Sequence, residues 1–273
     1  MSSLLIIGGN GLIGRAAHIT AERMGWAVTS IARRADSGVI ACASDRALAS
    51  LVGATGWGAV LDLRAYDEQS TLVVTQALAP SSAYVLVSSI YAYCHPQTHP
   101  ERDLGRLQEC SELTPTGTYG CGKVQAEQTA LSSSIESVYV VRLPFVFGVG
   151  DRTGRTEALW RFALASVDEQ VESFEIGLVS STVVAQKLTS LLDRHCPEHQ
   201  VLNVDSGSNW SMRHHLIAAR EAFRREGVQS SAADCPLEIG RDFSLDSSAL
   251  HKLLEAGVDD DLGRQWRDIA RAW

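Results

Sequence analysis

The sequence predicts an α/β protein built on a doubly wound parallel sheet, with a small C-terminal lobe. Over the first 150 residues, short β-rich runs alternate with amphipathic stretches of helical period, the pattern of successive βαβ units. The chain has 273 residues, of which 45% are hydrophobic, so it can bury a sizeable core without disulfides or a structural metal. We therefore expect a sheet domain over residues 1–150 and a second lobe over residues 151–273, some of whose elements cross back.

Each expected element of the sheet domain has a local signal. Strands are predicted where β-branched and other apolar residues run together, at residues 4–7, 27–31, 39–43, 59–63, 84–88 and 138–142. Helices are predicted where apolar residues recur at helical spacing, at residues 12–24, 46–52, 68–78 and 119–131. Gly25 ends the first of these helices and Pro80 stops the third. A loop rich in proline, glycine and charge is expected at residues 94–117.

Beyond Pro144 the pattern is looser. Helices are predicted at residues 157–165, 183–192, 212–226 and 247–256, and a short strand at residues 201–204. The sequence contains no internal repeat and no low-complexity linker. We therefore expect this lobe to pack against the sheet domain and to supply the wall of a substrate site.

Composition and charge exclude several classes of protein. The chain carries 32 acidic against 24 basic residues, a net charge of −8, which disfavours a nucleic-acid partner because phosphate binding needs clustered positive charge. The first residues lack the pattern of a signal peptide, and no apolar run approaches the roughly 18 residues that cross a bilayer. The six cysteines are scattered and form no Cys-x-x-Cys pair, as in reduced proteins. The expectation is a cytoplasmic protein with no membrane segment and no metal site.

A glycine-rich turn follows the first strand and opens the first helix. The run Gly8-Gly9-Asn10-Gly11-Leu12-Ile13-Gly14 fits Gly-x-Gly-x-x-Gly at 9, 11 and 14, and also Gly-x-x-Gly-x-x-Gly at 8, 11 and 14. In either register, glycines allow the tight turn and the close approach of backbone to a pyrophosphate at the helix N-terminus. The turn therefore predicts a dinucleotide-binding (Rossmann) site, with contacts from Gly8, Asn10, Gly11, Leu12, Ile13 and Gly14.

The end of the second strand indicates which dinucleotide is bound. An NAD site usually places an acidic residue here to accept from the ribose 2′-hydroxyl, whereas this chain has Ala32 followed by Arg33 and Arg34. Guanidinium groups bind a 2′-phosphate, and a carboxylate would repel it. NADP(H) is therefore preferred, with NAD(H) possible. Asp45 can accept from the adenine amino group or can cap the helix that follows it.

Two further motifs carry acid–base chemistry. Tyr119 and Lys123 stand four residues apart, so on a helix they share one face and can point into the same cleft. A nearby cation favours the phenolate and is expected to lower the pKa of Tyr119. Ser89 lies at the carboxyl end of the preceding strand, the edge at which open α/β sheets place their chemistry. We expect Tyr91 and Cys94, which follow Ser89 in the chain, to border the substrate pocket.

Together these motifs resemble the extended short-chain dehydrogenase/reductases, the NAD(P)-dependent epimerase/dehydratase and sugar-reductase group. The matches run over residues 4–152 and comprise the glycine turn, Ser88-Ser89 with Tyr93, Tyr119-Gly120-x-x-Lys123 with Glu127, and Arg142 with Val146-Phe147-Gly148. The resemblance implies Tyr119 as general acid/base, Lys123 as its ribose-binding partner and Ser89 as the hydroxyl that polarises the substrate carbonyl. It also implies that cofactor-lining residues follow two strands, namely Leu63, Arg64, Ala65, Pro144, Phe145 and Val146.

The sequence departs from this family at two informative positions. Gly122 replaces the serine of Tyr-Gly-x-Ser-Lys, which is expected to remove only a supporting hydrogen bond. Phe145 stands where many nucleotide-sugar epimerases have an asparagine, and we expect it to contact the substrate. An aromatic residue there resembles the dTDP-4-dehydrorhamnose reductases more closely.

The sequence thus favours an NADPH-dependent reductase that reduces the carbonyl of a small or sugar-type molecule. One alternative is a nucleotide-sugar epimerase or dehydratase with tightly bound NAD(P), and another is a non-catalytic NADP-binding regulator. The family resemblance also implies a homodimer through the helices at residues 68–78 and 119–131. Three arginines, Arg152, Arg155 and Arg161, can hold an anionic substrate group or can simply cover an exposed helix face.

Overall fold

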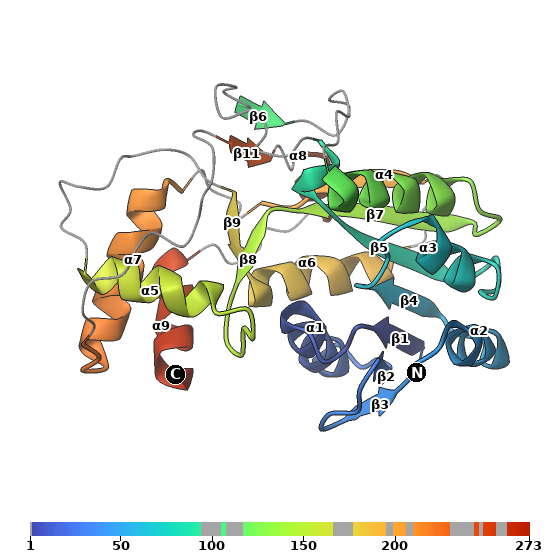
Figure 1. Cartoon of the computed structure of the whole chain (residues 1–273), viewed down its shortest axis with the longest axis horizontal. Coiled ribbons are helices and arrows are strands. Elements are labelled where there is room, and N and C mark those ends of the chain that lie inside the picture. The colour runs from blue at the N-terminus through green and yellow to red at the C-terminus, as the bar shows by residue number, and fades with distance from the viewer. Residues whose placement is uncertain are drawn as a thin grey trace.

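The computed structural model describes residues 2–93, 105–107, 117–165, 177–194, 199–205, 210–229, 243–245, 248–254 and 261–273. Its main feature is a sheet of seven parallel strands in the order β10-β7-β5-β4-β1-β2-β3 (Figure 1). The strands are β1 (Ser3–Ile7), β2 (Ala27–Ala32), β3 (Val39–Ala41), β4 (Ala59–Asp62), β5 (Ala83–Ser89), β7 (Ser137–Leu143) and β10 (Gln200–Asn203). The predicted doubly wound parallel sheet is confirmed.

Helices cover both faces of this sheet. On one face lie α1 (Leu12–Arg23) and α6 (Ser181–Leu192), which pack against Leu4 and Ile6 of β1. On the other face, α2 (Asp45–Ala54), α3 (Glu68–Thr75) and α4 (Gly117–Leu131) form a core with Leu5 and Ile7 of the same strand. Burial on both faces explains why the central strands are continuous apolar runs rather than alternating ones. Two elements beyond residue 150, α6 and β10, belong to this sheet domain.

The second lobe is mainly helical and lies beside the sheet domain (Figure 1). It comprises α5 (Arg155–Ala165), α7 (Met212–Arg225) and α9 (Leu262–Ala272), next to the paired strands β8 (Phe145–Phe147) and β9 (Leu178–Ser180). Its core contains two aromatic stacks, Trp160 on Phe223 and Phe147 on Trp266, each with ring centroids 4.6 Å apart. No helix is predicted from the sequence at the position of α9, although Leu262, Trp266 and Ile269 recur at helical spacing and are buried.

The loop expected at residues 94–117 needs one correction. Within it, β6 (Gly105–Leu107) pairs in parallel with β11 (Phe243–Leu245), a pairing between segments far apart in the sequence. The remaining described elements are a 3₁₀ turn, η1 (Ile90–Ala92), and a short helix, α8 (Ser248–Leu254). Cys94 lies outside the described residues.

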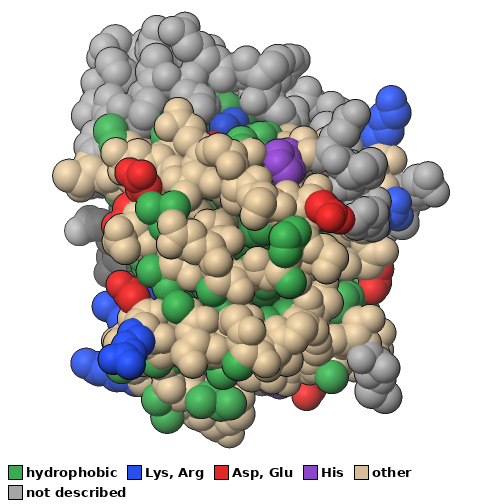
Figure 2. Space-filling model, turned by 90° about the vertical axis from the view of Figure 1, so that its right-hand side faces the viewer, with side chains coloured by type: hydrophobic (Ala, Val, Ile, Leu, Met, Phe, Trp, Pro, Cys, Tyr) green, Lys and Arg blue, Asp and Glu red, His purple; other side chains and the backbone are tan. Residues whose placement is uncertain are grey.

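No helix in the described ranges is long and apolar enough to span a membrane. Figure 2 shows the end of the molecule that carries α2 and α3, where acidic, basic and apolar side chains are interspersed.

Candidate functional site

The glycine turn is held tightly between β2 and the start of α1. The amides of Gly8 and Gly9 both donate to the carbonyl of Ile31, at 2.8 and 2.9 Å. Gly8 has a φ of +96°, which side chains disfavour, and a Cβ on Gly14 would lie 2.4 Å from the carbonyl oxygen of Gly8. These contacts require glycine at positions 8 and 14, and they bring the backbone of the turn to the N-terminus of α1.

That helix N-terminus suits an anion. Its N-cap residue is Gly11, which offers no side-chain cap, and its first turn contains no acidic residue. Free amides and the helix dipole therefore favour a negative group here. Leu12 and Ile13 are half-buried in this turn, and the carbonyl of Asn10 accepts from Arg15 Nη1 at 2.8 Å, which orders the loop.

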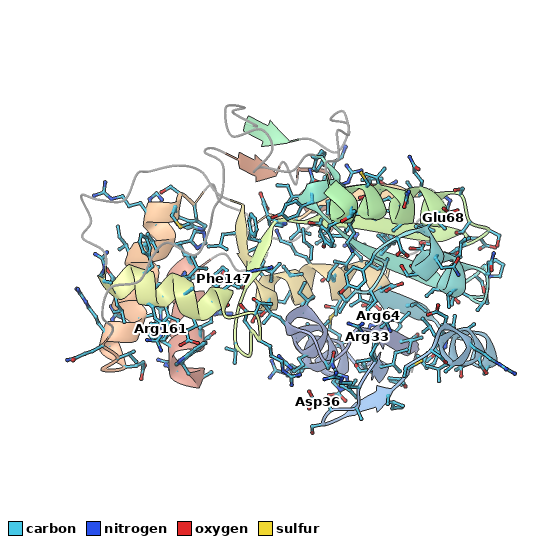
Figure 3. All side chains as sticks on the ribbon, in the orientation of Figure 1. Arg33, Asp36, Arg64, Glu68, Phe147 and Arg161 are labelled. Carbon is cyan, nitrogen blue, oxygen red and sulfur yellow. The ribbon has the colours of Figure 1, made fainter. Side chains whose placement is uncertain are left out.

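The residues after β2 are basic and exposed. Arg33 and Arg34 follow Ala32, and neither guanidinium has an ion-pair partner within the described ranges. The next acid, Asp36, is engaged by Arg152 of the second lobe at 2.6 Å, and this hydrogen bond holds its pKa below the usual value. Figure 3 shows Arg33 near the sheet edge and Asp36 on the connection to β3.

The structure decides one alternative at the start of α2. Ser44, rather than Asp45, is the N-cap, since the Ser44 hydroxyl accepts from the amide of Ala47 at 3.2 Å. Asp45 is exposed in the first turn. Its capping role is thus taken by its neighbour, and its contact with adenine stays a prediction.

The segment after β4 lies against the glycine turn. A Cβ on Gly8 would approach Leu63 Cβ at 3.1 Å and Arg64 Cγ at 3.4 Å. Asp62, which the sequence reading did not single out, anchors this segment by accepting from the amide of Arg64 at 2.7 Å and from the Tyr84 hydroxyl at 3.0 Å. Burial raises the pKa of the Asp62 carboxyl. The only sequence signal for this anchoring role of Asp62 is the order Asp-Leu-Arg directly after an apolar strand.

Lys123 is a buried cation that joins two strand exits. Its Nζ donates to the carbonyl of Ala65, after β4, at 2.8 Å and to the carbonyl of Val87, in β5, at 2.9 Å. Its side chain also lies over the ring of Tyr66, 5.1 Å from the centroid. Burial lowers the pKa of Lys123 to about 8, against the opposing charges of Asp62 and Glu127. An ammonium has three donors, so the two carbonyls leave one for a ligand.

Tyr119 and Ser89 lie near each other at the carboxyl end of β5. Ser89 lies close enough to Tyr119 to act on its phenol, and Tyr119 is 46% exposed while Ser89 is largely buried. Lys123 Nζ lies 5.7 Å from the centroid of the Tyr119 ring. The structure thus brings together all three residues that the sequence predicts to be catalytic.

The expected pKa shift of Tyr119 is wrong in direction. Burial raises the pKa of this phenol, while the neighbouring Ser89 hydroxyl acts to lower it. Lys123 directs its ammonium to the carbonyls of Ala65 and Val87 rather than to the phenol oxygen. A phenol with a raised pKa keeps its proton at neutral pH and can act as a proton donor.

An aromatic wall borders Tyr119. The Tyr91 ring meets the Tyr119 ring edge-on at 5.7 Å and the Phe145 ring at 6.2 Å. Phe145 and Val146 are half-buried, and Pro144 is buried before them. Tyr91 and Phe145, both predicted to contact substrate, therefore lie on the same side of the site.

A buried polar network supports the site from behind. Arg142 Nη2 pairs with Glu127 Oε2 at 2.7 Å, and the Ser88 hydroxyl donates to the same carboxylate. The Arg142 guanidinium lies over the Tyr93 ring, whose hydroxyl donates to Asn203 Oδ1 at 2.7 Å. The network connects α4 to β5, β7 and β10, and so fixes the helix that carries Tyr119.

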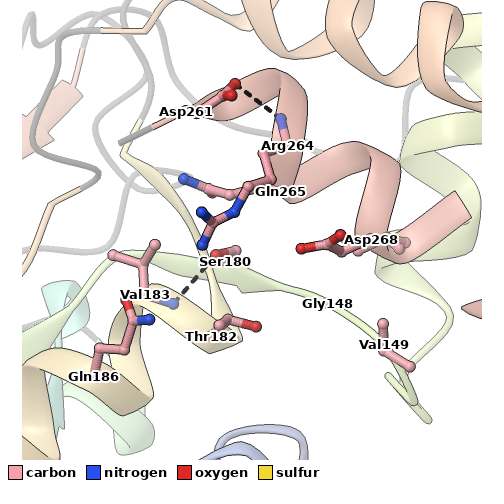
Figure 4. Close-up of a pocket in the computed structure, with 11 residues that line it drawn as sticks. Gly148, Val149, Ser180, Thr182, Val183, Gln186, Asp261, Arg264, Gln265 and Asp268 are labelled. Atoms are coloured by element: carbon pink, nitrogen blue, oxygen red, sulfur yellow. Dashed lines mark hydrogen bonds between the residues drawn. The ribbon is translucent and has the colours of Figure 1, made fainter. Parts of the chain in front are cut away.

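A separate narrow pocket lies between the start of α6 and α9 (Figure 4). It is lined by Gly148, Ser180, Gln186, Arg264 and Asp268, among others. None of the predicted site residues lines it.

No protein-family model matches the sequence, and no curated protein matches it. The fold is similar to that of the human epimerase family protein SDR39U1, isoform 2, with NADPH, at 19% identity, TM-score 0.72, over 98% of this chain and 99% of that chain. It is similar to UDP-glucose 4-epimerase from Bifidobacterium longum with NAD+ and UDP, at 16% identity, TM-score 0.73, over 99% and 98%. It is also similar to a short-chain dehydrogenase/reductase superfamily protein from Agrobacterium tumefaciens with bound NAD, at 15% identity, TM-score 0.75, over 99% and 96%. The fold implied by the resemblance is therefore confirmed.

Proposed function

We propose that this chain, which has the fold of the extended short-chain dehydrogenase/reductases, is an NADP(H)-dependent oxidoreductase that reduces a carbonyl group. The observation that carries the proposal is the position of the Tyr119 ring, whose centroid lies 5.7 Å from the buried ammonium of Lys123, with Ser89 acting on the same phenol. A protonated phenol, a second hydroxyl and a cation at one strand edge are the groups that carbonyl reduction needs.

The chain's residues fit the cofactor. Gly8 and Gly14 make contacts too close for a side chain. The turn that they enclose leads to the N-terminus of α1, which has no side-chain cap and suits a pyrophosphate. Arg33 and Arg34 are free to hold the 2′-phosphate of NADP(H), and Asp36 is neutralised by Arg152. NADP(H), when bound, supplies the hydride.

The protein side of the reaction follows from three groups. Ser89 and Tyr119 both donate hydrogen bonds to the carbonyl oxygen of the substrate, which polarises it. Tyr119 then gives its proton to that oxygen, and its raised pKa ensures that the proton is present at neutral pH. Lys123, held by Ala65 and Val87, uses its remaining donor on the ribose and stabilises the phenolate that is left.

A second candidate is an epimerase or dehydratase acting on a nucleotide sugar. This candidate is favoured because epimerases are among the solved structures whose fold is similar to that of this chain, including the UDP-glucose 4-epimerase with NAD+ and UDP. Phe145 weighs against it, since an aromatic ring stands where an amide would bind the sugar nucleotide. The non-catalytic alternative is weaker, because Ser89, Tyr119 and Lys123 are all present and close together.

Replacing Tyr119 with Phe tests whether the bound cofactor is used in catalysis. The variant should bind NADPH as the wild type does, by fluorescence titration, yet should not oxidise it with a carbonyl substrate. Purified wild-type protein that retains NAD(P) and shows no net NADPH consumption would favour the epimerase or dehydratase. Unchanged turnover in the variant would overturn the assignment of Tyr119.

The homodimer is also kept as a proposal. The exposed sides of α3 and α4 are the surfaces through which it would form, and sedimentation velocity of the purified protein would measure its mass.

A further inference from the structure

We propose that Tyr66 is a positioning residue of this site: its ring covers the ammonium of Lys123 and holds it in place as a cation. Tyr66 acts through Lys123 and takes no part in the transfer of hydride or proton. The inference rests on the proposed function, because it adds a residue to the same site. It is built from the groups that surround one buried nitrogen.

The ammonium of Lys123 is enclosed by carbonyl oxygens and aromatic rings. Its Nζ donates to the carbonyls of Ala65 and Val87 at 2.8 and 2.9 Å. The same nitrogen lies 5.1 Å from the centroid of the Tyr66 ring and 5.7 Å from that of the Tyr119 ring. Both distances fall within the roughly 6 Å over which the face of an aromatic ring attracts a cation. Because Lys123 is only 2% exposed, these groups take the place of water around the charge.

Neither apolar burial nor hydrogen bonding explains an aromatic ring at position 66. The Tyr66 side chain is 49% exposed, and it belongs to none of the three hydrophobic clusters that the described residues form. Over the part of the chain that the structure describes, its hydroxyl makes no hydrogen bond. The contact of the ring with the ammonium of Lys123 is therefore the feature that distinguishes this side chain.

The backbone of Tyr66 is fixed by two helices. Its amide donates to Ser70 Oγ at 3.1 Å, and the next residue, Asp67, is the N-cap of α3 and forms a capping box with Ser70. On the other side, a Cβ on Gly122 would collide with the carbonyl oxygen of Tyr66, so α4 packs directly on this backbone. The ring is thus carried to the ammonium by a segment with little freedom to move away.

The charges around Lys123 make the contact consequential. Burial lowers the pKa of Lys123 to about 8, and the charged groups that oppose this effect are Asp62 at the end of β4 and Glu127 on α4. Burial raises the pKa of Asp62, and Glu127 is engaged by Arg142 at 2.7 Å. Strand β5 adds a carbonyl but no charged side chain. The ring of Tyr66 therefore supplies attraction that the carboxylates only partly provide.

Titration of the lysines by NMR tests the contact without any turnover. The chain has three lysines, Lys123, Lys187 and Lys252, so full-length protein labelled with ¹³C at lysine Cε gives few signals, and the signal lost in Lys123→Arg identifies the one of interest. Its midpoint should lie at about pH 8 in the wild type. Tyr66→Leu keeps a side chain over the ammonium but removes the ring, and should lower the midpoint by roughly one pH unit.

The matched control is Tyr66→Phe, which keeps the ring and loses only the hydroxyl. Its Lys123 midpoint should equal that of the wild type, and the Lys187 signal should be unaffected by either change. An unchanged midpoint in Tyr66→Leu, or the same shift in Tyr66→Phe, would overturn the proposal. Circular dichroism checks folding. If Tyr66→Leu does not fold, Tyr66→Met, a second replacement without a ring, is titrated in its place with the same expectation.

Turnover distinguishes this inference from the function beneath it. With NADPH and para-carboxybenzaldehyde, a soluble aromatic aldehyde, the alkaline decline of kcat/KM should move to lower pH by the same roughly one unit in Tyr66→Leu and stay in place in Tyr66→Phe. A shifted Lys123 midpoint without any NADPH oxidation would leave the role of Tyr66 standing and contradict the reductase. Reduction of the aldehyde with an unshifted decline would do the reverse.

Discussion

Lys123 donates a hydrogen bond of 2.8 Å to the carbonyl of Ala65, so a buried cation on the helix of Tyr119 is tied to the exit of β4. A second bond to Val87 ties it to β5, the strand that ends in Ser89. The helix and both strand ends therefore keep a fixed relation, and the acid–base groups lie at the edge where the cofactor is expected.

The rate of reduction should fall as the pH rises through about 8. Lys123 has a pKa lowered to about 8, and Tyr119 has a raised pKa, so the ammonium loses its proton first. Reduction needs the proton of the Lys123 ammonium and the proton of the Tyr119 phenol. The decline of the rate at alkaline pH should therefore follow the titration of Lys123. The check is kcat/KM with NADPH between about pH 6 and about pH 10. Lys123→Arg should move the decline to higher pH, since a guanidinium keeps its proton. A flat profile would contradict this role.

The paired change Arg33→Ala and Arg34→Ala should weaken NADPH binding and spare NADH. Losing charged contacts to a 2′-phosphate costs about 2 kcal/mol, or roughly thirtyfold in Kd. Fluorescence titration with both cofactors measures the difference. The matched control removes another exposed pair, Arg224 and Arg225 at the end of α7. Equal losses for NADPH and NADH would show that these arginines do not read the 2′-phosphate.

Glu127→Gln should destabilise the protein strongly, because it leaves the buried guanidinium of Arg142 without its counter-ion. Both side chains are almost fully buried, and breaking such a pair costs about 3 kcal/mol or more in the free energy of unfolding. Urea denaturation measures the loss. The control, Glu157→Gln, breaks the exposed pair with Arg161 and should cost less than about 1 kcal/mol. Similar costs for the two variants would argue against a structural role for the network.

Gly122→Ala should disturb the site although it adds only a methyl group. A Cβ at this position would lie 2.4 Å from the carbonyl oxygen of Tyr66, so α4 would have to move away from the residues that hold Lys123. We expect a loss of about 1–3 kcal/mol in the free energy of unfolding and a lower kcat. Gly53→Ala is the control, because a Cβ there meets nothing closer than 3.5 Å, and it should be neutral or slightly stabilising. Unchanged kcat in Gly122→Ala would contradict the close packing.

Gly122 also shows what the sequence could not reveal. The expectation was a lost hydrogen bond relative to serine, whereas the contact with Tyr66 makes glycine necessary for the approach of α4. A contact between residues so far apart in the chain has no local signal. The pairing of β6 with β11 escaped prediction for the same reason.

Local patterns were sufficient elsewhere. The glycine turn, the buried strand that ends in Ser89 and the four-residue spacing of Tyr119 and Lys123 each follow from nearby residues. The parallel order of strands then brings their ends to one edge. The pKa of Tyr119 could not be predicted in this way, since it depends on burial and on where the Lys123 ammonium points.

The transfer of hydride to a carbonyl is the central claim, and isotope tracing tests it most directly. NADPH carrying deuterium at the hydride-donating carbon of the nicotinamide is incubated with para-carboxybenzaldehyde and the wild type, or with Tyr119→Phe as the inactive control. Mass spectrometry of the alcohol should show deuterium on the former carbonyl carbon with the wild type and no alcohol with the variant. Cofactor that keeps its deuterium in the presence of the wild type, with no alcohol formed, would contradict the account.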